Sequence, residues 1–156
     1  MGMEIERKFL VKGEGWREGA RRERIRQGYL NRDPERAVRV RTKGERGYLT
    51  VKGMGRGVAR AEFEYEIPVA DADAMLDTLA VRPLIEKTRH HVVHAGKAWE
   101  VDEFEGENAG LVVAEVELAS ESEAFEAPSW LGEEVSHDAR YFNQSLASRP
   151  YRTWKA

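Results

Sequence analysis

The sequence predicts an α+β protein that is mainly β-structure, in which eight strands close into a barrel with a charged lumen and helices packed outside. Two observations predict this fold class. Polar and apolar residues alternate with a period of two over eight stretches of the chain, as in strands with one apolar face. On the charged faces of these stretches, acidic residues are grouped together and basic residues are grouped together. Contact with water alone does not require such grouping. The length of 156 residues fits a single domain, residues 1–156.

The first predicted strand, residues 4–12, sets the pattern for the others. Glu4, Glu6 and Lys8 share one face because side chains alternate along a strand, whereas the other face is apolar except for Arg7. Taken alone, this stretch also fits an ordinary amphipathic edge strand with its charged face in water. The return of the same pattern along the chain favours a shared design. Seven further strands are predicted at residues 23–31, 37–43, 47–53, 59–67, 83–95, 97–104 and 111–118.

Two helices are predicted from apolar residues at helical spacing. Residues 71–80 carry such a stripe after an acidic start, as expected for a helix that covers a sheet. Residues 137–147 are predicted as the second helix. Ser120 and Glu123 form a capping box for a short third helix. Residues 13–22, which are rich in glycine and charge, are predicted as a loop or one short helical turn.

Composition excludes several classes of protein. The chain has no cysteine, which rules out a disulfide scaffold, a thiolate nucleophile and cysteine-ligated metal sites, and which is compatible with a reducing cytosol. We find no apolar run near 18 residues and no signal-peptide pattern. The net charge of −3 gives no electrostatic argument for nucleic acid or membrane partners. We therefore expect a soluble, cytoplasmic protein with neither partner.

The charged faces of the predicted strands indicate a ligand site. If they point into the barrel, eight carboxylates face six cations, with a formal charge of −2 that two divalent metals would bring to +2. Ions at such density are costly to bury unless they are paired, solvated or bound to other ions, so a packed core does not explain them. The acidic residues are Glu4, Glu6, Glu62, Glu64, Glu100, Asp102, Glu115 and Glu117, and the basic residues are Lys8, Arg39, Arg41, Lys52, Lys87 and Arg89.

These residue types favour a particular chemistry. Carboxylates without cysteine suit Mg²⁺ or Mn²⁺, one or two ions, which bind through a few carboxylates, waters and substrate phosphates. Arginine forks and lysine point charges complement phosphate groups. Phosphoryl transfer needs mainly positioning and neutralisation of charge. The sequence therefore predicts a site for phosphate chemistry.

The chain also resembles a known family. The run Glu4-x-Glu6-x-Lys8 looks like the signature of the CYTH superfamily, the triphosphate tunnel metalloenzymes. Further stretches resemble the strand motifs of that family in the same order and cover nearly the whole chain. They are Gln27-Gly28-Tyr29-Leu30, Arg39-Val40-Arg41, Leu49-Thr50-Val51-Lys52-Gly53, Glu62-Phe63-Glu64, Glu86-Lys87-Thr88-Arg89, Trp99-Glu100-Val101-Asp102 and Ala114-Glu115-Val116-Glu117-Leu118, with the ending from Tyr141 to Leu146.

The resemblance implies an eight-stranded antiparallel tunnel that binds a triphosphate-containing small molecule with a divalent metal. It implies metal ligands at Glu4, Glu6, Glu115 and Glu117, with Glu62, Glu64, Glu100 and Asp102 supporting them or holding a second ion. It also implies phosphate binding by Lys8, Arg39, Arg41, Lys52, Lys87 and Arg89. Candidate catalytic residues are Lys8, Lys87 and Tyr29, whose phenol is either an acceptor for the proton of the attacking water or a buried structural group.

The family shares a tunnel but not one substrate. Because the chain is short and has no obvious aromatic cradle, we expect hydrolysis of inorganic tripolyphosphate by water attack on a terminal phosphoryl group. Thiamine triphosphatase and class IV adenylate cyclase are the enzymatic alternatives. The non-enzyme alternatives are a polyphosphate- or nucleotide-binding module and a pure scaffold. We expect a monomer or a homodimer.

Overall fold

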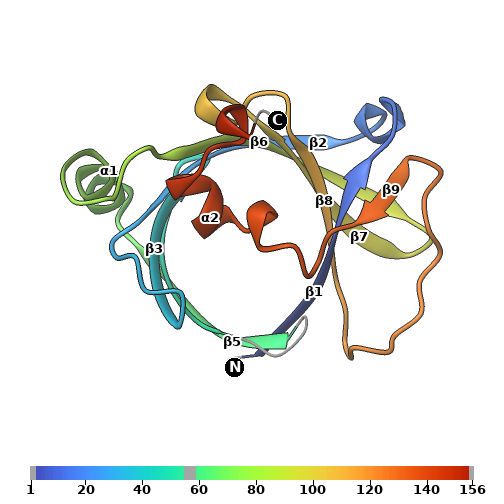
Figure 1. The fold of residues 1–156 in the computed structure, drawn as a ribbon, viewed down its shortest axis with the longest axis horizontal. Helices are drawn as coiled ribbons and strands as arrows, with labels where there is room; N and C mark the ends of the chain where they lie inside the picture. Colours follow the sequence, from blue (N-terminus) through green and yellow to red (C-terminus); the bar gives the residue numbers. More distant parts are fainter. Residues whose placement is uncertain (1–2, 55–58, 155–156) are drawn as a thin grey trace.

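The computed structural model describes residues 3–54 and 59–154, with the side chains of residues 3 and 4 outside the described part. The prediction of eight antiparallel strands that close into a barrel is confirmed (Figure 1). The order around the ring is β5-β4-β3-β2-β6-β7-β8-β1, and a pairing of β1 with β5 closes it. The strands are β1 (Met3–Val11), β2 (Arg21–Tyr29), β3 (Arg36–Lys43), β4 (Arg46–Gly53), β5 (Ala59–Ile67), β6 (Ile85–His94), β7 (Lys97–Phe104) and β8 (Val112–Glu117).

Strand β1 is the seam of the barrel. It pairs with β8 along its length, with β5 near its start, and near its end with a short ninth strand, β9 (Leu131–Glu134). Alternation does not predict β9, which has only four residues. β9 explains the polar exception on the apolar face of β1, because the Arg7 guanidinium donates two hydrogen bonds, of 2.9 and 2.6 Å, to the carboxylate of Glu134.

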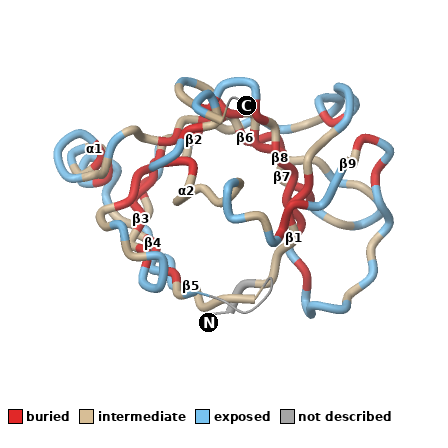
Figure 2. The backbone as a smooth tube through the Cα atoms, viewed as in Figure 1, coloured by how far each residue is buried: buried red, intermediate tan, exposed pale blue. Residues whose placement is uncertain are grey.

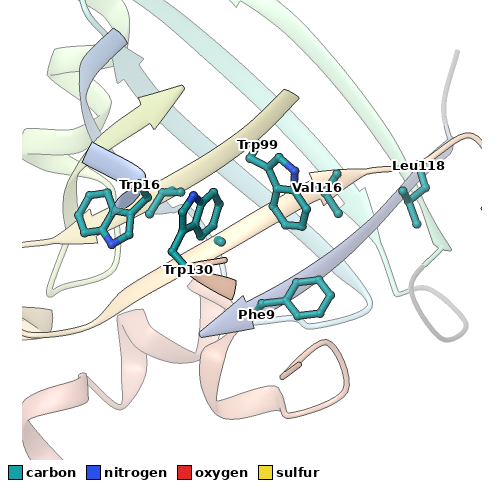
Figure 3. Close-up of a cluster of buried hydrophobic side chains, with 8 residues drawn as sticks. Phe9, Trp16, Trp99, Val116, Leu118 and Trp130 are labelled. Carbon is teal, nitrogen blue, oxygen red and sulfur yellow. The ribbon is translucent and has the colours of Figure 1, made fainter. Parts of the chain in front are cut away.

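An aromatic core lies against the outside of β1, β7 and β8. Trp99 of β7 is fully buried and contacts the rings of Phe9 and Trp130, with centroids 5.9 and 5.6 Å away (Figure 3). The Phe125 ring also contacts Trp99, with a centroid distance of 5.4 Å. Residues 119–130 cover this aromatic core. The short helix predicted from the Ser120 capping box is absent from this described segment, because the Glu123 carboxylate instead accepts the Ala119 amide at 2.6 Å within a turn and pairs with a lysine.

Helix α1 (Val69–Thr78) covers the outer face of β3 and β4, where Leu76 and Ala72 pack on Val40. The close packing of α1 and of the segment that follows it depends on a glycine. A Cβ atom added to Gly28 of β2 would lie 3.3 Å from Leu76 Cδ2 of α1 and 2.8 Å from both Ala80 Cβ and Leu84 Cδ2, which follow the helix. Within residues 3–54 and 59–154, no helix has both the length and the apolar character that a membrane crossing would need.

We expect Gly28→Ala to lower the free energy of unfolding by about 1–3 kcal/mol, because the added methyl group overpacks the contact of the barrel with α1 and with the segment that follows it. Urea unfolding measures this. Gly15→Ala is the matched control, since a Cβ atom there meets the Trp130 side chain at an ordinary 3.5 Å. Equal stability of the two variants would contradict this account of the packing.

The C-terminal helix differs from the expectation that helices pack outside. Residues 139–141 form a short 3-10 helix, and α2 (Asn143–Ser148) follows inside the ring of strands (Figure 1). Leu146 and Ala147 of α2 are buried in a cluster with Tyr29, Ile85 and other apolar residues of the barrel. Figure 2 shows buried stretches of the strands surrounding α2. Part of the lumen is therefore apolar, and the charged part is confined to the rest.

Candidate functional site

A charged cavity of about 440 Å³ lies inside the barrel. Because side chains alternate along a strand, one face of each strand points inward, and the predicted charged residues lie on that face. Ten of the predicted site residues line the cavity: Glu6, Arg39, Arg41, Lys52, Glu62, Glu64, Arg89, Glu100, Glu115 and Glu117. Lys8 lines an adjoining cavity, Lys87 and Asp102 are buried in the wall, and the Glu4 side chain lies outside the described residues.

The wall formed by β3 carries two buried arginines. Arg39 and Arg41 both point a guanidinium nitrogen at Glu64 Oε1, at 3.5 and 3.3 Å, and Thr50 donates a hydrogen bond of 2.7 Å to the same oxygen. Burial lowers the pKa of Arg41 to about 10, and the nearby cations Arg39 and Arg89 contribute to the shift. This wall thus holds more positive charge than its carboxylate neutralises, as an anion site requires.

A buried ion network lies in the wall formed by β6 and β7. Arg89 and Asp102 are opposite each other in register, and Arg89 Nε and Nη2 donate to the two Asp102 oxygens at 2.8 and 2.9 Å. Lys87 Nζ lies 2.8 Å from Asp102 Oδ2. Burial lowers the pKa of Lys87 to about 8, although Asp102 opposes the shift. Burial also disfavours the Asp102 carboxylate, but Arg89 and Lys87 outweigh it and hold the pKa of Asp102 well below its ordinary value.

The acidic side of the cavity is formed by β1, β7 and β8. Glu6 is opposite Glu117 in register, and Glu100 is opposite Glu115, although like charges in such positions destabilise a sheet. Lys8 Nζ approaches Glu115 Oε2 at 3.3 Å. Burial raises the pKa of Glu115, but Lys8 and other cations bring it down to about 2. The Glu115 side chain is therefore a buried carboxylate at neutral pH.

The donor set fits a hard divalent cation. The acidic side offers carboxylate oxygens, and the chain has no cysteine. Among the described residues, no three histidine, aspartate or glutamate side chains are close enough together to hold a metal ion by themselves. Such an ion would therefore share its ligands between a few carboxylates, waters and a substrate, as Mg²⁺ usually does.

A second cavity, of about 560 Å³, adjoins the first and shares Glu6 and Arg60 with it. Its wall mixes polar residues with Met54, Phe142 and Tyr29. The Tyr29 ring is 5% exposed and belongs to the apolar cluster around α2. Tyr29 thus lines the second cavity and is not among the described residues that line the charged one.

The structure adds several polar residues to the predicted set, among them Lys43, Arg60, Asn143 and Gln27. Lys43 lines the charged cavity and lies on the same face of β3 as the two arginines, so alternation alone points to it. The same signal would have found Arg60 on β5. Asn143 reaches the cavity from α2, which no sequence pattern indicates. Gln27 is fully buried opposite Arg41, and within the described chain its amide oxygen and nitrogen have no hydrogen-bond partner.

Comparisons with known proteins agree with this geometry. The CYTH domain model matches residues 2–151. The inorganic triphosphatase of Acetivibrio thermocellus is 48% identical over 155 residues, which are 99% of each chain. That of Nitrosomonas europaea is 38% identical over 92% of this chain and 96% of its own. A crystal structure of an inorganic triphosphatase superposes with a TM-score of 0.68 at 35% identity, over 92% of this chain and 93% of the other. The chain therefore belongs to the CYTH domain family.

Proposed function

We propose that this protein is a metal-dependent inorganic triphosphatase that hydrolyses tripolyphosphate inside the barrel. The single observation that supports this most is the lumen itself, where buried arginines face a row of carboxylates across a cavity of about 440 Å³. A polyanion would balance the positive charge of the arginines, and a divalent cation would balance the negative charge of the carboxylates. The names of the two full-length relatives point to the same activity.

The basic wall would grip the phosphates. Arg39, Arg41 and Arg89 are each at most 7% exposed, so their guanidinium forks act in a site shielded from bulk water. Burial, and then the neighbouring cations Arg39 and Arg89, lower the pKa of Arg41, and a bound anion would offset both effects. Lys52 and Lys8 extend the positive charge to either side of the arginines, and Lys87 supports it from within the wall.

The acidic wall would hold the metal. Glu6, Glu117 and Glu115 are the strongest candidate ligands, because they are neighbours on paired strands and face the cavity. When bound, a divalent cation would neutralise charge on the phosphate oxygens and help to position the attacking water. The remaining predicted ligands are Glu4, Glu62, Glu64, Glu100 and Asp102. Of these, Asp102 is better placed as the counter-ion of Lys87 and Arg89, because both of its oxygens face cations.

The proposed reaction needs no covalent intermediate. Water attacks the terminal phosphorus, the bridging P–O bond breaks, and orthophosphate and pyrophosphate form with release of one proton. The chain contributes by holding the phosphate oxygens and neutralising their charge, which is the main demand of phosphoryl transfer. Tyr29 would serve as the structural wall of the second cavity, because its ring is packed in an apolar cluster.

We expect the purified protein to release orthophosphate and pyrophosphate in equal amounts from tripolyphosphate with Mg²⁺ or Mn²⁺, and to lose this activity in EDTA. Colorimetric phosphate assays and ion chromatography measure both products. Tight binding of tripolyphosphate without turnover under any divalent ion would replace the proposal with a polyphosphate-binding module.

The second cavity favours one further candidate, hydrolysis or cyclisation of an organic triphosphate. Its mixed apolar and polar wall adjoins the charged cavity at Glu6 and Arg60, where a substituent on the phosphate chain would emerge. A parallel assay with thiamine triphosphate and ATP tests this candidate. Turnover of either compound above that of tripolyphosphate, or formation of cyclic AMP, would place the organic substrate first.

A further inference from the structure

Asn143 is the first residue of α2, and it lies where this helix meets both the charged cavity and the buried ion network. Its side-chain oxygen accepts a hydrogen bond of 3.2 Å from Lys87 Nζ. Lys87 is only 1% exposed and is not among the described residues that line either cavity, whereas Asn143 lines the charged one. The asparagine amide therefore touches the lysine on one side and the cavity on the other.

The chemistry of the pair fixes the orientation of the amide. A lysine ammonium group only donates hydrogen bonds, so the asparagine atom beside it must be the oxygen. The amide nitrogen, with its two N–H donors, is then directed away from Lys87. Lys87 itself is anchored from behind by Asp102 at 2.8 Å. A chain of contacts from Asp102 through Lys87 thus holds the amide of Asn143.

The neighbouring backbone is fixed in a similar way. Lys8 Nζ donates a hydrogen bond of 3.2 Å to the Tyr141 carbonyl oxygen and lies 5.6 Å from the centre of the Phe142 ring. Leu146, further along α2, is fully buried in the barrel. The start of α2 is therefore attached to both Lys8 and Lys87, which gives Asn143 a defined position on the cavity wall.

We propose that Asn143 is a phosphate-contacting residue, whose amide nitrogen donates a hydrogen bond to an oxygen of the bound phosphate chain. Lys87 is then the positioning residue that orients this amide and, through its charge, polarises it toward the anion. The inference rests on the proposed function, because it names a contact for the same substrate. It gives α2 a role in recognising the substrate, in addition to filling part of the barrel.

The experiment compares Asn143→Ala and Asn143→Asp with the wild type in steady-state hydrolysis of tripolyphosphate with Mg²⁺. We expect kcat/KM to fall about 10- to 100-fold for Asn143→Ala, the usual loss for a hydrogen bond to a charged group. Asn143→Asp should fall further, because its carboxylate repels the phosphate chain. Melting temperatures without ligand should change little, since Lys87 keeps Asp102 as its partner.

Asn108 provides a matched control. Its buried side-chain oxygen accepts the Tyr151 backbone amide at 2.7 Å, outside the described lining of both cavities. We expect Asn108→Ala to lower the melting temperature and to keep kcat/KM within about twofold of the wild type, the reverse of the Asn143 result.

Three results would overturn the proposal. They are an unchanged kcat/KM in Asn143→Ala, a loss accompanied by an equal loss of folded protein, and equal activities of Asn143→Asp and Asn143→Ala. If the wild type binds tripolyphosphate without hydrolysing it, the proposed function fails, and calorimetric affinities of the same variants still decide the contact. If the wild type does neither, both proposals fall.

Discussion

Replacing Arg41 with alanine is expected to lower kcat/KM for tripolyphosphate about 100- to 1,000-fold, the range found when one preorganised donor to a developing charge is removed. Arg41 lies in the β3 wall, 7% exposed, and its pKa is lowered to about 10 by burial and by neighbouring cations. Its fork therefore meets an anion where water competes weakly. Initial rates of phosphate release over a range of substrate concentrations measure the effect.

Two variants serve as controls for Arg41. Arg41→Lys keeps the charge but loses the planar fork, so its activity should fall between those of the wild type and Arg41→Ala. Arg26→Ala removes an arginine that is paired with Asp73 and Asp77 of α1, at 3.2 and 2.6 Å, and should leave the rate unchanged. If Arg41→Ala and Arg26→Ala had the same activity, the basic wall would have no part in catalysis.

Replacing Asp102 with alanine should lower the free energy of unfolding by about 3–5 kcal/mol, because a buried charge left without its partner is strongly destabilising. Asp102 is 2% exposed and faces two cations, Lys87 and Arg89, at 2.8 Å each. The wild type should exceed Asp102→Ala in free energy of unfolding by the full amount above about pH 5. This difference should decline as the pH falls below the ordinary aspartate pKa, near 3.9. Urea unfolding at several pH values tests both statements.

Asp77→Ala is the comparison for Asp102. Asp77 also pairs with an arginine, Arg26 at 2.6 Å, but its side chain is 62% exposed, so the loss should be at most about 1 kcal/mol. Equal losses in the two variants would mean that the network around Asp102 gives no more stability than a surface ion pair. Asp102→Asn removes the charge while keeping the shape of the side chain, and it should also be less stable than the wild type.

Sequence alternation predicted the barrel because each strand is constrained on two faces at once. A charged face and an apolar reverse, repeated over eight strands, are both accommodated in a closed sheet with a wet interior and a covered exterior. Strand positions were therefore predicted closely, as β5 shows, with observed bounds of Ala59–Ile67 against the predicted 59–67. The ten predicted residues that line the charged cavity follow from the same alternation.

Elements whose placement depends on distant partners were not predictable. The apolar stripe of the C-terminal helix fits equally well on the outside of a barrel or inside its lumen, so nothing local places Leu146 beside Ile85. β9 pairs with β1 through only a few residues, and its Leu-Gly-Glu-Glu sequence has little strand character. The capping box predicted from Ser120 and Glu123 was wrong, because the Glu123 carboxylate accepts the amide of Ala119 within a turn.

The sequence predicted which residues form the site, but not which of them form ion pairs with one another. Sequence alone placed Asp102 with the other carboxylates as a supporting metal ligand. The register that puts Arg89 opposite Asp102 depends on how β6 and β7 align, and that alignment turns the carboxylate toward two cations. Asn143 was missed for a related reason, because its role depends on where α2 docks.

The position of β1 as the seam has a consequence for how the chain is made. β1 is synthesised before β8 and β9, with which it pairs, and the other strands of the ring lie between them in the sequence. The edge of β1 that pairs with β8 therefore has no partner until all the other barrel strands have been made, and such long-range pairing is slow. The ring can therefore close only after every one of its strands has been synthesised.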